Sequence, residues 1–208
     1  LWFLAYLFTY SIFGLVVFRI LQSSPGRNLI SRLAALCAKH PLALMLFALP
    51  LGIFHVLLFP HYPATNSLVN DWAWHAQLFT AFVYGYVLVA DERFAVTIGR
   101  HWRAFLISAV LLTGVVFAIR GLEGIPTRGL LYRGASWTWI LALLGVAWTY
   151  FNKPSAQLSY LSAASYPFYI IHQAMIVGAA YFIVRWDAGV WTKFLVLLPL
   201  AFFATAAT

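Results

Sequence analysis

Charged residues are scarce in this sequence. Of its 208 residues, 9% are Asp, Glu, Lys or Arg, and only five are acidic. Soluble domains carry roughly 25% charged residues, so this deficit excludes an ordinary soluble globule. Hydrophobic residues make up 63% of the chain, which also excludes a disordered chain. The composition is typical of a protein whose surroundings are largely lipid.

Cysteine and the common catalytic motifs are also nearly absent. Cys37 is the single cysteine, so neither an intrachain disulfide nor a cysteine metal cluster can form. The sequence has no HExxH, GxSxG, P-loop or GxGxxG pattern, and its His, Asp and Glu residues do not fall at metal-ligand spacing on one helix. We therefore expect no metal cofactor.

The basic residues suggest a lipid partner. The formal net charge is +8, which in a soluble protein would suggest nucleic acid binding. Here the Lys and Arg residues lie in short gaps between apolar runs. That placement predicts contact with membrane lipid, and no nucleic acid partner.

Long apolar runs dominate the chain. Each is close to the length of about 20 residues that a transmembrane helix needs, and backbone polar groups in lipid must pair within the segment. The runs are Leu1–Ile20, Pro41–Pro60, Trp72–Ala90, Trp102–Ile119, Ala135–Phe151, Tyr166–Val184 and Val190–Thr208. We predict an all-α polytopic integral membrane protein with seven transmembrane helices in a single domain, residues 1–208. Because the chain begins and stops inside apolar runs, we expect a piece cut at both ends.

The gaps between the runs predict an orientation. More basic residues fall in gaps 21–40, 91–103 and 152–157 than in the alternate gaps. The positive-inside rule places these three gaps in the cytoplasm. Residue 1 then lies outside the inner (plasma) membrane and residue 208 lies in the cytoplasm. A retinal protein of this topology would need a lysine deep in its last helix, whereas Lys193 lies at the edge of that run.

His172 is an ionisable residue inside the sixth run, where lipid makes such groups costly. It lies roughly 9 Å into the predicted helix at 1.5 Å per residue, and Pro167 falls in the first turn. Tyr166, Tyr169 and Gln173 can hydrogen-bond with it. The imidazole can act as a general base or hold a polar ligand. The alternative is that it only ties helices together.

Two further histidines lie in or beside predicted helices. His75 stands at the start of the third run, close to Asp71, and a carboxylate–imidazole pair can bind or activate a hydroxyl. The alternative is that Asn70 and Asp71 simply cap the helix. His55 lies in the second run, where it can hydrogen-bond across helices.

Arginines form two groups. The outer group interrupts the positive-inside pattern and suits carboxylate, phosphate or sugar hydroxyls, or else salt bridges and lipid phosphates. The inner group suits the phosphates of a nucleotide-like donor, or else only sets the topology. The outer group is Arg120, Arg128 and Arg133, and the inner group is Arg93, Arg100 and Arg103.

Motifs near both ends resemble one family. The stretch SYPFYIIHQ, residues 165–173, closely resembles the signature near the end of the membrane-bound acyltransferase 3 family, and is nearest to its glucans biosynthesis protein C branch. The opening LWFL, residues 1–4, looks like the tail of the family's His-Leu-Trp-Phe-Leu motif. Residues 70–91 are similar to a family helix with a Gly-Tyr near its inner end, here Gly85-Tyr86.

The resemblance implies a function. The family's fold is a bundle of roughly ten helices, of which this chain would supply the fourth to the tenth. Its members transfer an acyl group, often acetyl or succinyl, from acyl-coenzyme A to a hydroxyl of an extracytoplasmic glycan. The family's main catalytic histidine would precede Leu1, so we expect the chain to be inactive alone, with His172 as a supporting or candidate catalytic residue. The substrate-binding candidates are Trp2, His75, Arg120, Tyr169 and Gln173.

Two alternatives from other functional classes stay open. One is a transporter or flippase for a small polar or lipid-linked molecule, which would show broken helices in two related halves. The other is a structural membrane protein. The sequence predicts no oligomeric state.

Overall fold

The structure is a computed structural model that describes residues 2–63, 65, 67–119, 121 and 128–207, with side chains from residue 4 onward. Every regular element within those ranges is helical, so the predicted all-α class is confirmed there. Contacts divide the chain into two compact units, Leu1–Asn152 and Lys153–Thr208. Each unit is described by itself, and the single domain stays a prediction.

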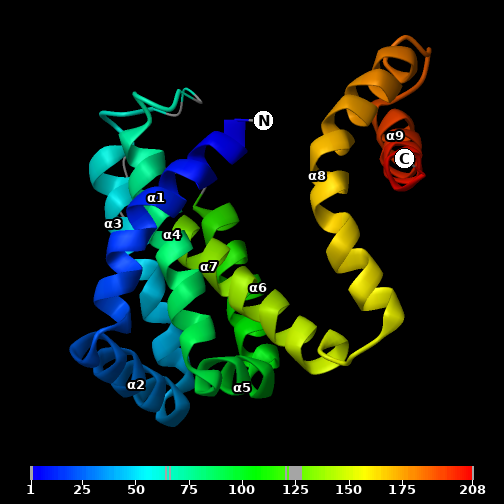
Figure 1. Ribbon diagram of the computed structural model, residues 1–208. Coiled ribbons are helices and arrows are strands. Elements are labelled where there is room, and N and C mark those ends of the chain that lie inside the picture. Colours follow the sequence, from blue (N-terminus) through cyan, green and yellow to red (C-terminus); the bar gives the residue numbers. More distant parts are fainter. Residues whose placement is uncertain (1, 64, 66, 120, 122–127, 208) are drawn as a thin grey trace. The chain divides into compact units, whose positions relative to one another are not determined.

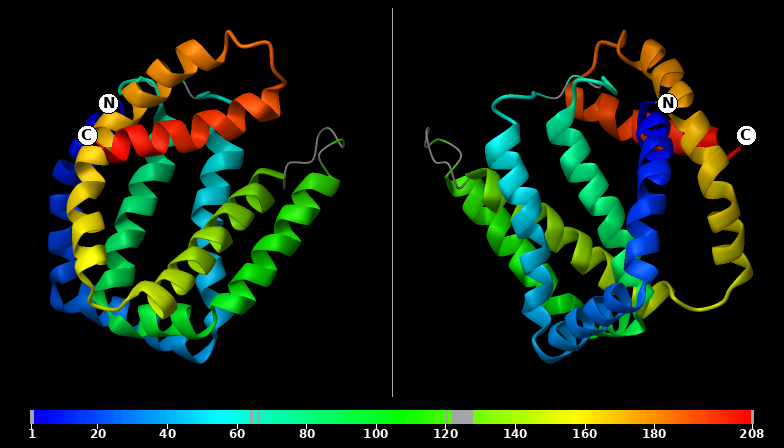
Figure 2. Two further views of the ribbon diagram at one scale, coloured as in Figure 1. Left: turned by 90° about the vertical axis from the view of Figure 1, so that its right-hand side faces the viewer. Right: turned by 60° about the vertical axis from the view of Figure 1, so that its left-hand side comes forward.

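Within the described residues, the first unit contains the α-helices α1 to α7, a 3₁₀ helix and a π-helix (Figure 1). Helices α2 and α5 lie side by side at one end, and residues 59–63 and 67–71 lie at the other end (Figure 2). The elements are α1 (Trp2–Gln22), α2 (Ser24–Lys39), the 3₁₀ helix η1 (Pro41–Phe47), α3 (Ala48–Leu58), α4 (Trp72–Ala90), α5 (Glu92–Arg100), α6 (Trp102–Ala118), α7 (Arg128–Val146) and the π-helix η2 (Ala147–Phe151).

All seven predicted spans coincide with helices in the described residues, but their lengths differ. Five helical segments are long and apolar enough to cross a membrane, and a sixth qualifies if α5 and α6, bent by 69°, count as one. Helix α9 (Val190–Ala206) is a shorter apolar helix of 17 residues. The structure therefore supports five or six spans, and the count of seven is not confirmed.

Two of the three gaps expected at the cytoplasmic side contain amphipathic helices that the sequence analysis missed. In α2, Ser23 caps the first turn and Gly26, Ile30, Ala34 and Cys37 form the buried face. That spacing is the helical repeat of an apolar stripe. In α5, Asp91 is the N-cap and Phe94 is fully buried. Burial raises the pKa of the Cys37 thiol. The two helices contribute to one core cluster.

The corner between α5 and α6 packs closely against α7. A Cβ atom on Gly145 would lie 2.5 Å from Trp102 Cβ and 2.7 Å from the Ile98 carbonyl oxygen. Thr149 Oγ1 lies 3.1 Å from the Gly99 carbonyl oxygen and 2.7 Å from that of Gly145. Glycine at 145 therefore permits a backbone approach that a side chain would prevent.

A buried hydrogen bond joins η1 to α7 inside the core. Trp137 Nε1 donates to the Leu44 carbonyl oxygen at 2.8 Å. Leu44, Phe105 and Leu141 are fully buried around it. A 3₁₀ run of seven residues is unusually long, and the indole satisfies one of its carbonyls.

The second unit consists of α8 (Ala156–Ile183) and α9. Ser155 caps α8 by accepting from the Leu158 N–H at 3.0 Å. Helix α8 begins before the sixth predicted run, which started at Tyr166, because the small residues before Tyr166 continue the helix. Pro167 consequently lies inside the helix, where it removes one backbone hydrogen bond. At the far end of α8, Lys193 Nζ donates to the Val184 carbonyl oxygen at 2.9 Å.

Candidate functional site

A buried carboxyl group lies at the end of the first unit away from α2 and α5. Asp71 is 1% exposed. Its Oδ2 accepts from the Tyr6 hydroxyl at 2.9 Å, and its Oδ1 accepts from the Thr65 backbone N–H at 2.8 Å and from Thr65 Oγ1 at 2.6 Å. Burying a carboxyl group is costly unless hydrogen bonds replace its water. These three bonds therefore stabilise Asp71.

His75 lies beside this carboxyl group, and its ring stacks on Tyr6 with 4.9 Å between centroids. Its Nε2 lies 2.8 Å from the Leu68 carbonyl oxygen, and its Nδ1 lies 3.0 Å from the Tyr10 hydroxyl. A carbonyl only accepts, so Nε2 carries the proton and Nδ1 accepts from Tyr10. We call Tyr6, Tyr10, Thr65, Asp71 and His75 the Tyr–Asp–His cluster.

The structure thus brings the predicted residues His75 and Asp71 into one cluster. Each of them forms a hydrogen bond with a tyrosine of α1, Asp71 with Tyr6 and His75 with Tyr10. Asp71 occupies the N-cap position of α4, as the capping alternative expected, but its side chain makes no capping hydrogen bond. Capping therefore does not account for its carboxylate. The sequence analysis missed Tyr6 and Tyr10. Their spacing of four residues, which places both hydroxyls on one helix face, was the available signal.

Helix α4 carries a further buried polar side chain. Gln77 is 3% exposed, and neither Oε1 nor Nε2 has a hydrogen-bond partner within the described residues. Such groups are rare, because most buried polar side-chain atoms are paired. Gln77 therefore places an unpaired amide two residues after His75, as judged within the described residues.

A second polar contact joins α3 to α7. Arg133 Nε and Nη2 lie 3.3 Å and 3.2 Å from His55 Nδ1, which confirms that His55 hydrogen-bonds across helices. The guanidinium carbon lies 5.4–5.6 Å from the ring centroids of Phe59, Trp74 and Tyr132, within range of cation–π attraction. Arg133 and Arg128 were expected in a gap, but α7 begins at Arg128, so both are helical.

A cavity of about 1050 Å³ adjoins this contact, between the ends of α3, α6 and α7. Across it, Trp139 Nε1 donates to Thr113 Oγ1 at 3.0 Å. Its described lining is His55, Val56, Phe59, Pro60, Thr113, Val116, Phe117, Arg128, Gly129, Tyr132, Ala135, Ser136 and Trp139.

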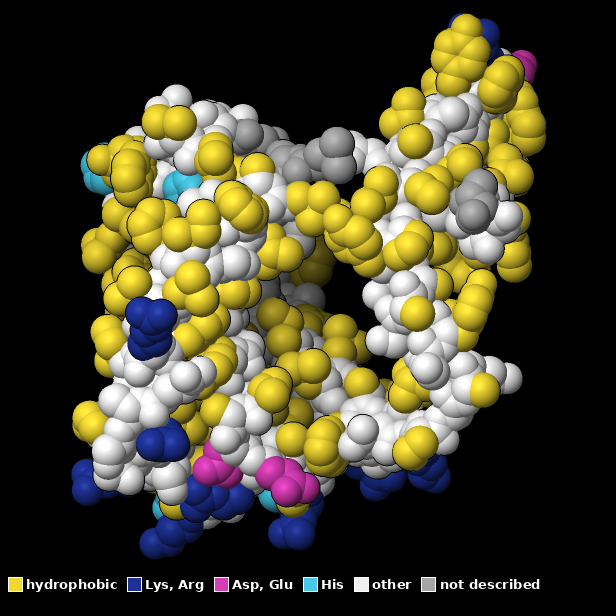
Figure 3. All heavy atoms as spheres, in the orientation of Figure 1, with side chains coloured by type: hydrophobic (Ala, Val, Ile, Leu, Met, Phe, Trp, Pro, Cys, Tyr) yellow, Lys and Arg dark blue, Asp and Glu magenta, His cyan; other side chains and the backbone are white. Residues whose placement is uncertain are grey.

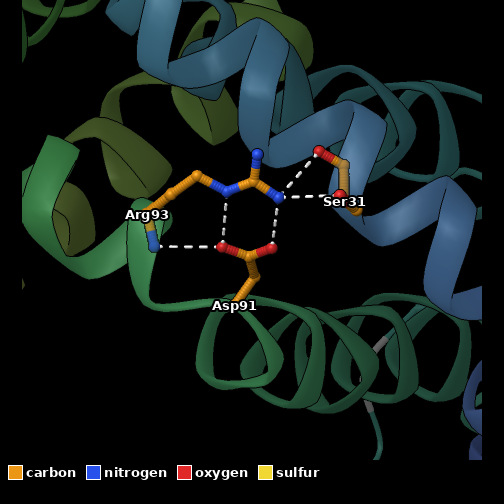
Figure 4. A network of polar contacts seen from close by, with 3 residues as sticks. All are labelled: Ser31, Asp91 and Arg93. Atoms are coloured by element: carbon orange, nitrogen blue, oxygen red, sulfur yellow. Dashed lines mark hydrogen bonds and ion pairs between the residues drawn. The ribbon is translucent and has the colours of Figure 1, made fainter.

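At the other end of the unit, Arg93 makes a structural contact (Figure 4). Its Nε and Nη2 donate to the two Asp91 carboxylate oxygens at 2.9 Å and 2.6 Å, and Nη2 also donates to Ser31 Oγ at 2.8 Å. Hydrogen bonds from Arg93 hold the pKa of Asp91 below its usual value. Arg93 therefore joins α5 to α2, while Arg103 lies over the Trp102 ring at 5.3 Å.

Lys and Arg side chains gather at this end of the first unit (Figure 3). A pocket of about 360 Å³ along α5 includes Arg100 and His101. Arg100 lines this pocket beside Glu92 and Arg93. Among the described residues, Arg93 is paired with Asp91, and no ion pair engages Arg100 or Arg103.

In the second unit, His172 lies on α8 with Tyr169 and Gln173. Its Nδ1 lies 2.5 Å from the Tyr169 carbonyl oxygen, so Nδ1 donates and Nε2 of the neutral ring is the basic nitrogen. The Phe168 ring is parallel to it at 6.4 Å and also contacts Phe202 of α9. Because α8 begins at Ala156, His172 lies roughly 24 Å along the helix, and the predicted 9 Å is wrong.

Two predicted substrate-binding residues, Arg120 and the side chain of Trp2, lie outside the described residues. His75 belongs to the first unit and His172 to the second. Within the described residues, no group of three or more His, Cys, Asp or Glu side chains could hold a metal ion.

Comparison with known proteins finds no matching family model, no matching curated protein and no matching solved structure. The likeness to the acyltransferase 3 family therefore rests on the motif residues alone.

Proposed function

We propose that this chain is part of a membrane O-acyltransferase that moves an acetyl or succinyl group from acyl-coenzyme A to a hydroxyl of an extracytoplasmic glycan. The Tyr–Asp–His cluster carries the proposal, because it joins a buried carboxyl group, two phenols and an imidazole at one end of the bundle. The opposite end carries the arginines of α5 and α6. The SYPFYIIHQ motif on α8 supports the same assignment.

The cluster suits the activation of a hydroxyl. As the acceptor oxygen attacks the thioester carbonyl carbon, a C–O bond forms, the C–S bond breaks and the hydroxyl proton must leave. In the proposed route this proton passes to Tyr10 while Tyr10 gives its own to His75 Nδ1, and Asp71 holds Tyr6 against the imidazole. The proton then returns to the departing thiolate of coenzyme A. General base catalysis of this kind contributes roughly 10²–10⁴-fold.

The two ends of the bundle also suit the two substrates. We propose that the end with α2 and α5 faces the cytoplasm of a cell whose inner membrane holds the protein, so that Arg100 and Arg103 meet the coenzyme A phosphates. The Tyr–Asp–His cluster then faces the glycan. On α8, His172 is proposed as a supporting or candidate catalytic residue through its basic Nε2, with Tyr169 and Gln173 as substrate-binding residues. Trp2 and Arg120 are proposed to contact the acceptor.

Acyl transfer by the protein expressed from its full gene tests the proposal. Membranes would receive radiolabelled acetyl- or succinyl-coenzyme A, and label would be counted in the glycan fraction. We expect His75→Ala to lower transfer roughly 100-fold, with insertion unchanged. His61→Ala, which changes an exposed histidine in the segment 59–71, is the matched control. Equal activity of both variants would remove His75 from the chemistry.

A transporter is the second candidate, because two consecutive helices of the first unit form a sharply bent pair. Helices α5 and α6 meet at 69°, as in a broken span or a re-entrant loop, and discontinuous helices form the substrate sites of many transporters. The same assay separates the two functions. A transferase releases free coenzyme A thiol as label enters glycan, whereas a transporter moves its substrate unchanged.

A further inference from the structure

Part of the lining of the cavity between α3, α6 and α7 consists of polar side chains. Arg128, His55 and Thr113 belong to its lining, and none of its described lining residues is acidic. The proposed acyl transfer uses none of these three side chains.

The contact with Arg133 determines which nitrogen of the His55 ring carries the proton. A guanidinium group only donates, so His55 Nδ1 accepts and the proton of the neutral ring lies on Nε2. Protonating Nδ1 would break this contact and place two cations together. Gly129 leaves room for the ring, because a Cβ atom there would lie 2.3 Å from His55 Cδ2. His55 therefore offers an N–H donor.

Thr113 supplies a second donor. Its Oγ1 accepts from Trp139 Nε1, so its own hydroxyl hydrogen can still be donated. Together with the guanidinium of Arg128, the polar part of the lining offers a positive charge and hydrogen-bond donors. A phosphate or carboxylate group is the ligand that such a set recognises.

The rest of the wall is apolar and the cavity is large. Val56, Val116 and Phe117 belong to this part. At about 1050 Å³, the cavity is slightly larger than the range of roughly 300–1,000 Å³ for small-molecule sites. The helices α3 and α7 that border it lie in segments apolar enough to cross a membrane, where amphiphiles are the abundant molecules.

We propose that this cavity binds an anionic amphiphile. The oxyanion head is held by Arg128, His55 Nε2 and Thr113, and the apolar chain lies along Val56, Val116 and Phe117. Arg133 is a positioning residue that sets the His55 tautomer. The proposal does not rest on the acyltransferase function, because none of these residues belongs to the Tyr–Asp–His cluster.

Native mass spectrometry of the intact protein in neutral detergent tests the site. The probes are dioleoylphosphatidylglycerol, its phosphatidylcholine counterpart and inorganic phosphate. We expect the phosphatidylglycerol to bind at least 10-fold more tightly than the phosphatidylcholine. Inorganic phosphate at equal concentration should not displace the phosphatidylglycerol. Equal binding of the two lipids would overturn recognition of an anion. Displacement by phosphate would overturn the need for an apolar chain.

Variants then locate the site. Arg128→Gln should weaken binding of the phosphatidylglycerol about 10-fold, as expected for one lost charge-assisted contact. Arg19→Gln, in the last turn of α1 and outside the lining of the cavity, should leave it unchanged. Equal losses in both would indicate general attraction to basic residues and overturn the assignment.

A third variant protects the test from misfolding. Val116→Trp fills the cavity without changing any charge, and it should abolish binding of the phosphatidylglycerol. If Arg128→Gln does not insert into membranes, this variant decides alone. Unchanged binding in Val116→Trp would overturn the site.

Discussion

The two ends of the first unit use ionisable groups in opposite ways. Near α2 and α5, the Asp91–Arg93 pair lies at the surface, where Arg93 is 45% exposed. At the other end, Asp71 is buried and depends on Tyr6 and Thr65 for its hydrogen bonds. Water can replace a partner at the first end but not at the second. The same residue type therefore orders a surface in one place and a candidate reaction site in the other.

The largest expected effect is the loss of the buried carboxyl group. Asp71→Ala leaves the Tyr6 hydroxyl and the Thr65 donors without this acceptor, so we expect the free energy of unfolding to fall by about 3 kcal/mol. Thermal unfolding in detergent, followed by tryptophan fluorescence, measures the change. Asp91→Ala is the matched control and should lose much less. Equal losses would show that burial does not distinguish the two ends.

The α2 and α5 end should be sensitive to packing rather than to charge. Gly145→Ala forces a Cβ atom against Trp102 and Ile98, so we expect a loss of about 2 kcal/mol in the same measurement, as for other overpacked sites. Gly114→Ala is the control, because its Cβ atom would meet nothing within 4 Å. It should be neutral or slightly stabilising. A neutral Gly145→Ala would show that the corner can shift.

A single hydroxyl of the Tyr–Asp–His cluster should matter less for stability. Tyr10→Phe removes the donor to His75 Nδ1, and we expect a loss of about 1 kcal/mol. If the proposed proton route operates, acyl transfer falls by more than this change in stability explains. Tyr160→Phe, at an exposed tyrosine, is the control for both measurements. Full transfer by Tyr10→Phe would exclude the phenol from the route.

Continuous apolar runs predicted the helices well, and α4 covers the expected Trp72–Ala90. Two features escaped. One is the buried face of α2, with Ile30, Ala34 and Cys37. This face lies in a charged segment that was interpreted only as a gap between membrane spans. The polar contacts join residues far apart in the chain, 65 residues for Tyr10–His75 and 78 for His55–Arg133. Spacing within one helix carries no information on such pairs, because packing of separate helices creates them.

The smallest expected effect is the pH dependence of the exposed pair. Hydrogen bonds from Arg93 lower the pKa of Asp91 from its ordinary 3.8, so the folded state binds that proton less readily than the unfolded state. This contribution to stability is fully present above about pH 4 and is lost as the pH falls through the lowered pKa. Thermal unfolding of the parent protein and of Arg93→Gln should therefore differ slightly at pH 6, and the difference should shrink as the pH falls below about 4. A difference that stays constant as the pH falls would assign the role of Arg93 to its contact with Ser31 instead.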